Sequence, residues 1–389
     1  MKRSFLSTAV LGSVLAVGGA ACLGAQSGSY QSEDGPYRVV TVADGLQNPW
    51  SIAFLPGGDI LVTERPGRLR VIRDGQLLPD PVEGVPEVRA QGQGGLMEIV
   101  LHPDFETNRL IYMSIAKPNA DGSQSTTAVV RARYEGNRLE NLEEIFEAQA
   151  WSNTTGHYGA RLAFDSDGYL WVTVGDRMAP PSLEGATRHA AQDPSNHQGT
   201  VVRLHDDGRV PEDNPFVGRP DALPEIWSYG HRNLQGLAIH PETGDIWETE
   251  HGPQGGDELN LILPERNYGW PVIGYGVNYG GGIIHEGTQK EGMEQPVNYW
   301  VPSIATSGLM IYSGDRFPDW RGSIFAGGLA GSYIERLTMN GREVVGKERI
   351  VDGIGRIRDI KQGPDGFIYV AIDGRGAGTT SVVRLEPAG

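Results

Sequence analysis

Four polar segments flanked by glycine contain the residues of this sequence whose types and spacing could do chemistry. They are QGQGGL (residues 91–96), TTGHYGAR (154–161), YGHRNLQG (229–236) and TEHGPQGGDELN (249–260). Polar side chains beside glycines are typical of backbone that lies close to a ligand, because glycine has no Cβ to block the approach. His157 is a candidate general base, although a histidine in such a loop more often only hydrogen-bonds a turn.

Other segments supply cations and carboxylates. Arg232 lies in the third segment, and GIGRIRDI places Arg356 and Arg358 on one side of an extended chain, because side chains alternate with a period of two. Guanidinium groups bind carboxylates through paired hydrogen bonds. The oxygen-rich fourth segment, with Asp257 and Glu258, suits Ca²⁺. Each feature alone is typical of exposed charge, so the chemistry depends on whether the fold brings these segments together.

A turn followed by an alternating strand recurs six times and predicts the fold. The copies begin at residues 56, 102, 165, 240, 319 and 363. Several are followed by a second strand with a similar turn, and a spacing of roughly 45 to 80 residues is typical of propeller blades. We therefore predict an all-β, six-bladed β-propeller in which YRVVTVA (37–43) closes the last blade. A pair of β-sandwiches is the alternative. In a propeller, loops from distant segments converge at one end of the channel.

The ends of the chain and its charge limit the function classes. Residues 1–25 have the basic head, apolar run and small residues of a signal peptide, with Cys22 as an alternative lipid-attachment site. We expect a flexible leader over 26–36, a propeller over 37–389, no transmembrane segment in the mature chain, and a periplasmic or secreted protein. Cys22 is the only cysteine, so the mature domain has no disulfide. A formal charge of −16 argues against nucleic acid as a partner.

The motifs together resemble the soluble quinoprotein glucose dehydrogenases and, more closely, the PQQ-dependent aldose sugar dehydrogenases of bacterial periplasms. The resemblance covers nearly the whole predicted mature chain. Its motifs are NPWSIAFLP, GQGGL followed by HPDF, GARLAFDSDGYLWVTVGD, YGHRNLQGLA, EHGPQGGDELNLI with NYGWP, and RIRDI before GPDG. It implies a six-bladed propeller that uses pyrroloquinoline quinone (PQQ) and Ca²⁺ to oxidise an aldose at C1 to the lactone. An unidentified electron acceptor and a monomer or homodimer are also expected.

The resemblance implies a role for particular residues. His157 matches the family's catalytic base, Arg232 matches the arginine at the reactive carbonyl of the quinone, and Asn233 matches a cofactor contact beside it. The remaining matches are Gln93 near cofactor and substrate, Arg356 and Arg358 at the cofactor carboxylates, the main-chain oxygens of Gly252 and Pro253 at the cofactor's Ca²⁺, Glu258 and the Tyr268 carbonyl at a second, structural Ca²⁺, and Trp300 in the aromatic wall of the sugar site.

Three positions depart from the glucose dehydrogenase pattern. Gly156 stands in place of an aspartate, His251 in place of a glutamine as in the aldose branch, and Ala330 in place of a cofactor-binding lysine. Two alternatives therefore stay open. One is a quinoprotein of the same fold for another substrate, such as a sorbosone-type sugar aldehyde or an alcohol. The other is a propeller that has lost catalysis and serves as a binding module, against which the retained arginines and His157 argue.

Overall fold

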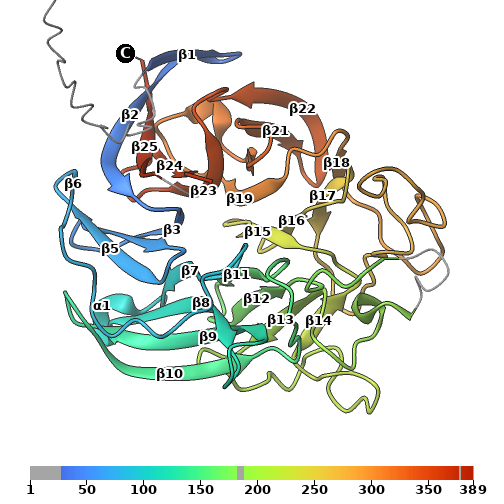
Figure 1. The fold of residues 1–389 in the computed structure, drawn as a ribbon. Coiled ribbons are helices and arrows are strands. Elements are labelled where there is room, and N and C mark those ends of the chain that lie inside the picture. The colour runs from blue at the N-terminus through green and yellow to red at the C-terminus, as the bar shows by residue number, and fades with distance from the viewer. Residues whose placement is uncertain (1–27, 182–187, 376–377, 389) are drawn as a thin grey trace, which may run out of the picture.

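Six antiparallel sheets surround a central axis, like the blades of a propeller (Figure 1). The computed structural model describes residues 28–181, 188–375 and 378–388, and the predicted signal sequence with Cys22 lies outside them. The innermost strand of each blade contacts the innermost strand of the next. The prediction of a six-bladed β-propeller is therefore confirmed, in preference to paired sandwiches.

Blades 1 to 5 each consist of four strands that follow one another in the chain, from the innermost outwards. Blade 1 comprises β3 (Pro49–Phe54), β4 (Ile60–Glu64), β5 (Arg68–Arg73) and β6 (Gln76–Leu77), and blade 2 comprises β7 (Leu96–Leu101), β8 (Leu110–Pro118), β9 (Ser125–Tyr134) and β10 (Leu139–Glu147). Blade 3 comprises β11 (Gly159–Phe164), β12 (Leu170–Val174), β13 (Thr200–Leu204) and β14 (Ile226–Tyr229). Blade 4 comprises β15 (Leu234–Ile239), β16 (Ile246–Glu250), β17 (Asp257–Leu261) and β18 (Asn298–Trp300), and blade 5 comprises β19 (Thr306–Ile311), β20 (Ile324–Gly328), β21 (Ile334–Asn340) and β22 (Glu343–Ile350).

Blade 6 joins the two ends of the described chain. Its strands, again from the inside, are β23 (Arg356–Gln362), β24 (Ile368–Asp373), β25 (Thr380–Pro387), β2 (Gly35–Leu46) and β1 (Gly28–Ser32). Strand β2 pairs with β25, so the prediction that an early strand closes the ring is confirmed. The flexible leader expected over 26–36 is corrected from residue 28 onwards, because β1 forms a hairpin with β2 and Tyr30 stacks on Tyr37 with ring centroids 5.5 Å apart.

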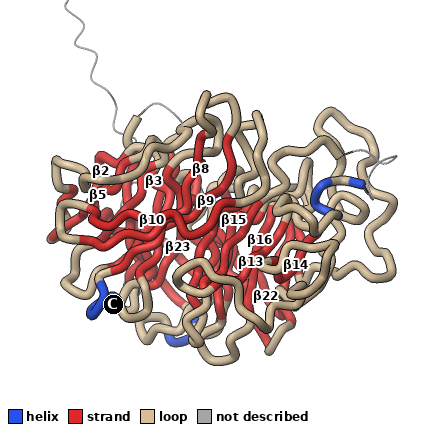
Figure 2. Tube along the Cα trace, turned by 90° about the horizontal axis from the view of Figure 1, so that it is seen from below, coloured by secondary structure: helices blue, strands red, loops and turns tan. Residues whose placement is uncertain are grey.

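Helical structure is sparse in the described residues. It consists of α1 (Phe105–Asn108) and the short 3₁₀ turns η2 (Ala190–Gln192) and η3 (Pro318–Trp320). Seen from the side, the strands occupy a middle layer and loops extend beyond it on both faces (Figure 2). None of the described helices has the length and apolar character needed to cross a membrane. Most of the described residues outside the strands lie in loops, and the strands hold these loops in place.

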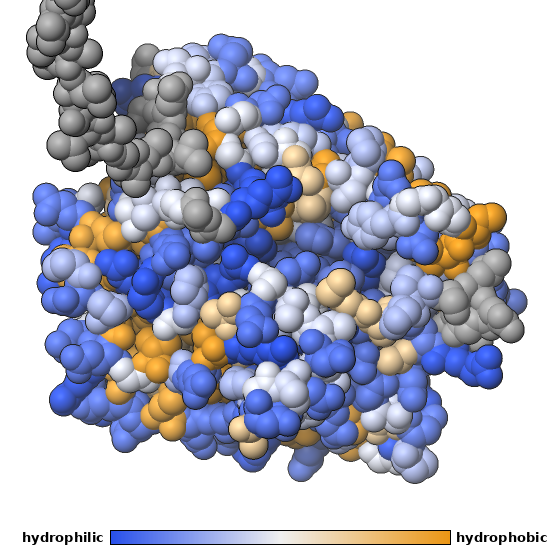
Figure 3. Space-filling model, viewed as in Figure 1, coloured by the Kyte–Doolittle hydropathy of each residue, from blue (hydrophilic) through white to orange (hydrophobic). Residues whose placement is uncertain are grey.

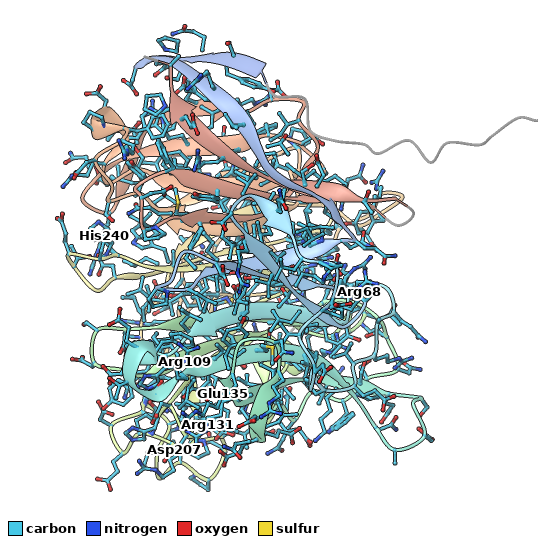
Figure 4. The ribbon with its side chains drawn as sticks, turned by 90° about the vertical axis from the view of Figure 1, so that its left-hand side faces the viewer. Arg68, Arg109, Arg131, Glu135, Asp207 and His240 are labelled. Atoms are coloured by element: carbon cyan, nitrogen blue, oxygen red, sulfur yellow. The ribbon has the colours of Figure 1, made fainter. Side chains whose placement is uncertain are left out.

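The core lies between the blades. On β12, Leu170 and Val172 pack against blade 2, whereas Trp171 between them packs against blade 4. The same alternation occurs on β16, where Ile246 faces blade 3 and Trp247 faces blade 5. Each blade thus buries both faces only by stacking between two neighbours, which is why the middle strands read as almost continuous apolar runs. A polar contact also joins blades 2 and 3 at the outside, where Arg131 Nη1 donates to Asp206 O at 3.2 Å, close to Asp207 (Figure 4).

A buried ion cluster lies on the axis. Arg161 on β11 is 2% exposed, and its Nη1 donates to Glu98 Oε2 on β7 and to Asp359 Oδ1 on β23, each at 2.7 Å. Lys361 Nζ donates to Glu98 Oε1 at 3.1 Å, so two cations neutralise two carboxylates. Burial would raise the pKa of the Glu98 carboxyl, but Lys361 and Arg161 hold that pKa below its usual range. Breaking such a pair leaves an uncompensated buried charge.

We expect Arg161→Met to lower the free energy of unfolding by about 3 to 5 kcal/mol, because Glu98 and Asp359 would lose their shared cation in the interior. The matched control is Arg73→Met, which removes an exposed arginine paired with Asp59 and should cost much less because water screens that pair. Denaturant unfolding followed by tryptophan fluorescence measures both changes. Similar losses in the two variants would contradict a special role for the axis cluster.

Candidate active site

The predicted site residues come together at one end of the channel. Gln93, His157 and Arg232 each precede an innermost strand, and Arg356 begins the innermost strand of blade 6. Innermost strands all enter the ring from the same face, so these positions surround the axis. The space-filling view shows hydrophilic residues gathered around the centre of the ring (Figure 3).

His157 is held on two sides. Its backbone has φ 50°, and its main-chain N–H donates to Gln93 Oε1 at 2.8 Å. Its ring Nδ1 lies 2.6 Å from Asp176 Oδ1, and the other oxygen of Asp176 accepts from Trp270 Nε1 at 2.7 Å. An ionised Asp176 keeps the proton on Nδ1, so Nε2 becomes the basic nitrogen of the neutral ring.

The electrostatics favour a neutral imidazole. Burial lowers the pKa of His157, the charge of Asp176 opposes this, and Arg232 and Arg177 lower it further, so the net pKa lies below the usual value. Burial would raise the pKa of Asp176, but His157 and Arg232 hold it below its usual range. His157 is therefore unprotonated near neutral pH, which is the state that a general base needs.

Arg232 and Asn233 are fixed but keep unused donors. Arg232 Nη1 donates to Gly252 O at 2.8 Å and to His251 O at 2.9 Å, and its guanidinium lies 5.0 Å from the centre of the Trp270 ring. Within the described residues, Arg232 Nε and Asn233 Nδ2 are buried without a hydrogen-bond partner. Buried donors are normally paired, so these two fit an acceptor on a bound ligand.

Arg356 and Arg358 share one carboxylate. Arg356 Nε and Arg358 Nη2 contact Asp373 Oδ2 at 3.4 and 3.3 Å. Burial lowers the pKa of Arg358 to about 10, and Arg65, which sequence analysis did not single out, is one of the nearby cations that add to this effect. Positive charge therefore exceeds negative charge here, as a ligand with carboxylates requires. Ala330 adjoins Leu329, whose carbonyl accepts from Arg356 Nη1 at 2.9 Å, so the site lacks a lysine at its edge.

The four predicted metal residues line one cavity together with Arg232. They are Gly252, Pro253, Glu258 and Tyr268. The neighbouring His231, Glu248 and Glu250, which were not among the predicted metal residues, have ligand atoms that lie within 4.8 Å of one another.

A single amide serves three carboxylates beside this cavity, two of which, Glu250 and Glu258, line it. Asn260 Nδ2 is 3.3 Å from Glu248, 3.2 Å from Glu250 and 3.4 Å from Glu258, although an amide has only two N–H bonds. Among the described residues, Glu248 Oε1 and Asn260 Oδ1 are buried without a partner. Burial, with the charge of Glu250, raises the pKa of Glu248 and Glu258 well above the usual range. Carboxylate, amide and main-chain oxygens are the ligands that Ca²⁺ prefers.

Trp300 lies apart from the other predicted residues. Its ring is 6% exposed and packs in the core with Trp247 and Ile304, and its indole N–H donates to Glu335. The ring presents no face to a sugar in this structure. Strand alternation explains the difference, because the exposed neighbour on β18 is Tyr299, which stacks on Tyr275 with centroids 3.9 Å apart.

Two signals could have found the missed residues. Asp176 lies two residues after the end of β12, at the same end of the ring as His157, so the topology of a blade predicts their proximity. Glu248 and Glu250 alternate on β16, which places both carboxylates on one face of a buried strand. Buried acidic pairs of this kind are rare unless a cation or a proton compensates them.

The chain matches a family model described as glucose/sorbosone dehydrogenase over residues 46–382. It is 41% identical over 342 residues to the aldose sugar dehydrogenase YliI of Escherichia coli (strain K12), a match that covers 86% of this chain and 90% of that protein. A crystal structure of a glucose dehydrogenase superposes with a TM-score of 0.83 at 44% identity, covering 90% of this chain and 99% of that one. The PQQ-bound form of an aldose sugar dehydrogenase from Streptomyces coelicolor superposes with a TM-score of 0.72 at 28% identity, covering 93% of this chain and 98% of that one.

We expect Asp176→Asn to lower the pKa of His157 further, because the Asp176 charge is what opposes the effect of burial. The measurement is an NMR titration of histidine ring carbons in protein labelled with ¹³C-histidine, with the His157 signal assigned from His157→Gln. Asp165→Asn is the control, since Asp165 accepts from Trp171 Nε1 on another part of blade 3. An unchanged or raised pKa would show that Asp176 does not act on the ring as a carboxylate.

Proposed function

The chain belongs to the glucose/sorbosone dehydrogenase family, and we propose on this basis that it is an oxidoreductase that uses PQQ to oxidise an aldose sugar at C1 to the lactone. The observation that carries the proposal is the neutral, buried His157, which Asp176 orients beside the unused donors of Arg232 and Asn233. A base and a charge-stabilising group then lie in one polar cleft.

The residues present fit the cofactor. Arg356 and Arg358 would bind its carboxylates, and Arg232 Nε and Asn233 Nδ2 would donate to its carbonyl oxygens. Gln93, exposed beside His157, would contact both cofactor and sugar. When bound, the quinone supplies the acceptor for the C1 hydride.

The chain's own chemistry is a proton transfer. His157 Nε2 would take the proton of the C1 hydroxyl as the hydride leaves, and Asp176 would stabilise the imidazolium that forms. Arg232 would stabilise negative charge that develops on the acceptor side. Gln93 and Asp176 hold His157 from its main chain and its ring, so the base would be positioned before the sugar arrives.

Calcium would complete the site in two places. The main-chain oxygens of Gly252 and Pro253 would hold one ion for the cofactor, and Glu258 with the Tyr268 carbonyl would hold a structural ion in the same cavity. The three carboxylates around Asn260 support the second place, because a divalent cation would compensate their charge. A periplasmic or secreted location and a separate electron acceptor stay part of the proposal.

Activity should require both PQQ and Ca²⁺. We expect the apoprotein to reduce an artificial electron-acceptor dye with an aldose only after both are added, because arginines and metal share the anionic cofactor. A panel of aldoses, sorbosone and simple alcohols would identify the substrate class. Full activity in excess chelator without added metal would contradict the role of calcium, and the lack of any PQQ-dependent reaction would contradict the function.

His157→Ala should leave PQQ binding nearly unchanged and reduce kcat by about 10²- to 10⁴-fold, the usual range for a positioned base. His240→Ala is the matched control, because His240 lies in the turn between β15 and β16, at the opposite end of β15 from Arg232 (Figure 4). In the wild type, kcat/KM should fall as His157 becomes protonated, at a pH below about 6.5 because burial lowers its pKa. Turnover within a few-fold of wild type in His157→Ala would mean that the base lies elsewhere.

A further inference from the structure

Gln235 links three blades at the floor of the site. It lies on the innermost strand β15 and is 6% exposed. Its side-chain Nε2 donates to Gly159 O at 3.0 Å and to Asn233 Oδ1 at 3.3 Å. Its Oε1 accepts from Arg358 Nη1 at 3.2 Å. One amide thus contacts the strand that follows the base, the segment of Arg232 and the strand of the cofactor-carboxylate arginines.

The contact with Gly159 fixes the start of β11, the strand that follows His157. Gly159 has φ +66°, and a Cβ there would lie 2.8 Å from main-chain atoms of Gly175 and Thr173, so this backbone has little freedom to adjust. Its N–H also approaches Asn233 Oδ1 at 3.4 Å. Gln235 and Asn233 therefore hold both main-chain groups of a residue that lies only two positions after the proposed base.

The contact with Arg358 fixes the other side of the site. Asp373 holds one amino group of Arg358 at 3.3 Å, and Gln235 holds the other. The main chain of Gln235 is itself anchored, because its carbonyl accepts from Arg161 Nε at 2.7 Å. The Gln235 amide is therefore held in one orientation and bridges the two sides of the site. Its oxygen accepts from a cation, and its N–H groups donate to two oxygens.

We propose that Gln235 is a positioning residue that couples the cofactor-binding arginine Arg358 to the loop of the base. The proposal rests on the proposed function, because only that function assigns roles to Arg358 and His157, which lie at the two ends of this bridge. Gln235 acts through Arg358, Gly159 and Asn233. A purely structural role would instead affect only the stability of the blades.

Two variants of Gln235 distinguish its contact with Arg358 from its contacts with Gly159 and Asn233. Gln235→Met keeps the volume and removes both kinds of hydrogen bond. Gln235→Glu keeps an oxygen at Arg358 but adds a negative charge and removes the donors to Gly159 and Asn233. The control is Gln362→Met, because Gln362 on β23 accepts from Ser313 N at 2.8 Å, away from the residues of the site.

We expect Gln235→Met to weaken PQQ binding about tenfold, as loss of a hydrogen bond to a charged group would. With saturating PQQ and Ca²⁺, its kcat should fall about tenfold while KM for the sugar stays within about twofold, because a displaced base slows the reaction without removing a sugar contact. Gln235→Glu should weaken PQQ binding more than Gln235→Met, since its carboxylate would compete for Arg358. Gln362→Met should match the wild type in PQQ affinity and kcat.

PQQ affinity is measured by fluorescence titration of the apoprotein, kcat and KM by dye reduction, and stability by thermal unfolding of each apoprotein. Wild-type PQQ affinity and kcat in both Gln235 variants, with only a lower Tm, would overturn the proposal and make Gln235 a packing residue. Wild-type affinity in Gln235→Glu alone would overturn its link to Arg358. Failure of the wild-type protein to bind PQQ would instead overturn the proposed function.

Discussion

The buried guanidinium of Arg161 is the constraint on which the rest of the structure depends. It donates to carboxylates from blades 2 and 6, to the Gln235 carbonyl of blade 4 and to the Arg358 carbonyl of blade 6, and it lies over the Trp50 ring of blade 1 at 4.2 Å. Apolar packing between blades resists separation but tolerates sliding, because it is not directional. Directional bonds to one planar cation set the distances between innermost strands. The cluster therefore turns six stacked sheets into a ring of defined geometry.

All six innermost strands share one irregularity, a shift in their pairing with the second strand, at the end of the ring where the candidate site lies. In each of them the pairing with the second strand shifts near its start, between Pro49 and Ser51, Leu96 and Ile99, Gly159 and Leu162, Leu234 and Gly236, Thr306 and Leu309, and Ile357 and Asp359. A bulge re-aims the side chains beside it and bends the strand. The regular part of each strand packs the core, and so do Leu96, Leu234 and Ile357 beside the shifts. The candidate site residues Gln93, His157 and Arg232 lie in the segments just before these strands, so strands that hold the blades together also position the site.

The contrast between regular strands and the irregular segments before them explains which features the sequence could predict. The second strand of every blade has a turn before it and begins with consecutive apolar residues, so six repeats and the closing strand were recognisable. Strand β1 is short and polar, and only its pairing with β2 makes it a strand. The candidate site residues His157, Arg232 and Arg358 were singled out through motifs, but Asp176 and Gln235 were not, because their partners lie 19 and 123 residues away. The resemblance implied that Trp300 lines the sugar site, whereas its ring packs in the core, because strand alternation decides which way a side chain points.

Positive and negative charges occupy separate parts of the site, although the formal net charge of the whole chain is −16. Arg356 and Arg358 gather around the single carboxylate of Asp373, and Arg65 adds to the same field. The acidic residues lie on the other side of Arg232, whose main-chain N–H binds Glu250. Glu250 thereby joins the two regions, since one of its oxygens fixes Arg232 and the other faces His231 and Asn260. An anionic ligand and a divalent cation would each meet the opposite charge, and a cleft with low-dielectric walls strengthens both attractions. An alanine at position 330, where the resemblance implies a lysine, is then compatible with an anionic ligand, because the local field depends on several cations that the axis cluster and Gln235 hold in place.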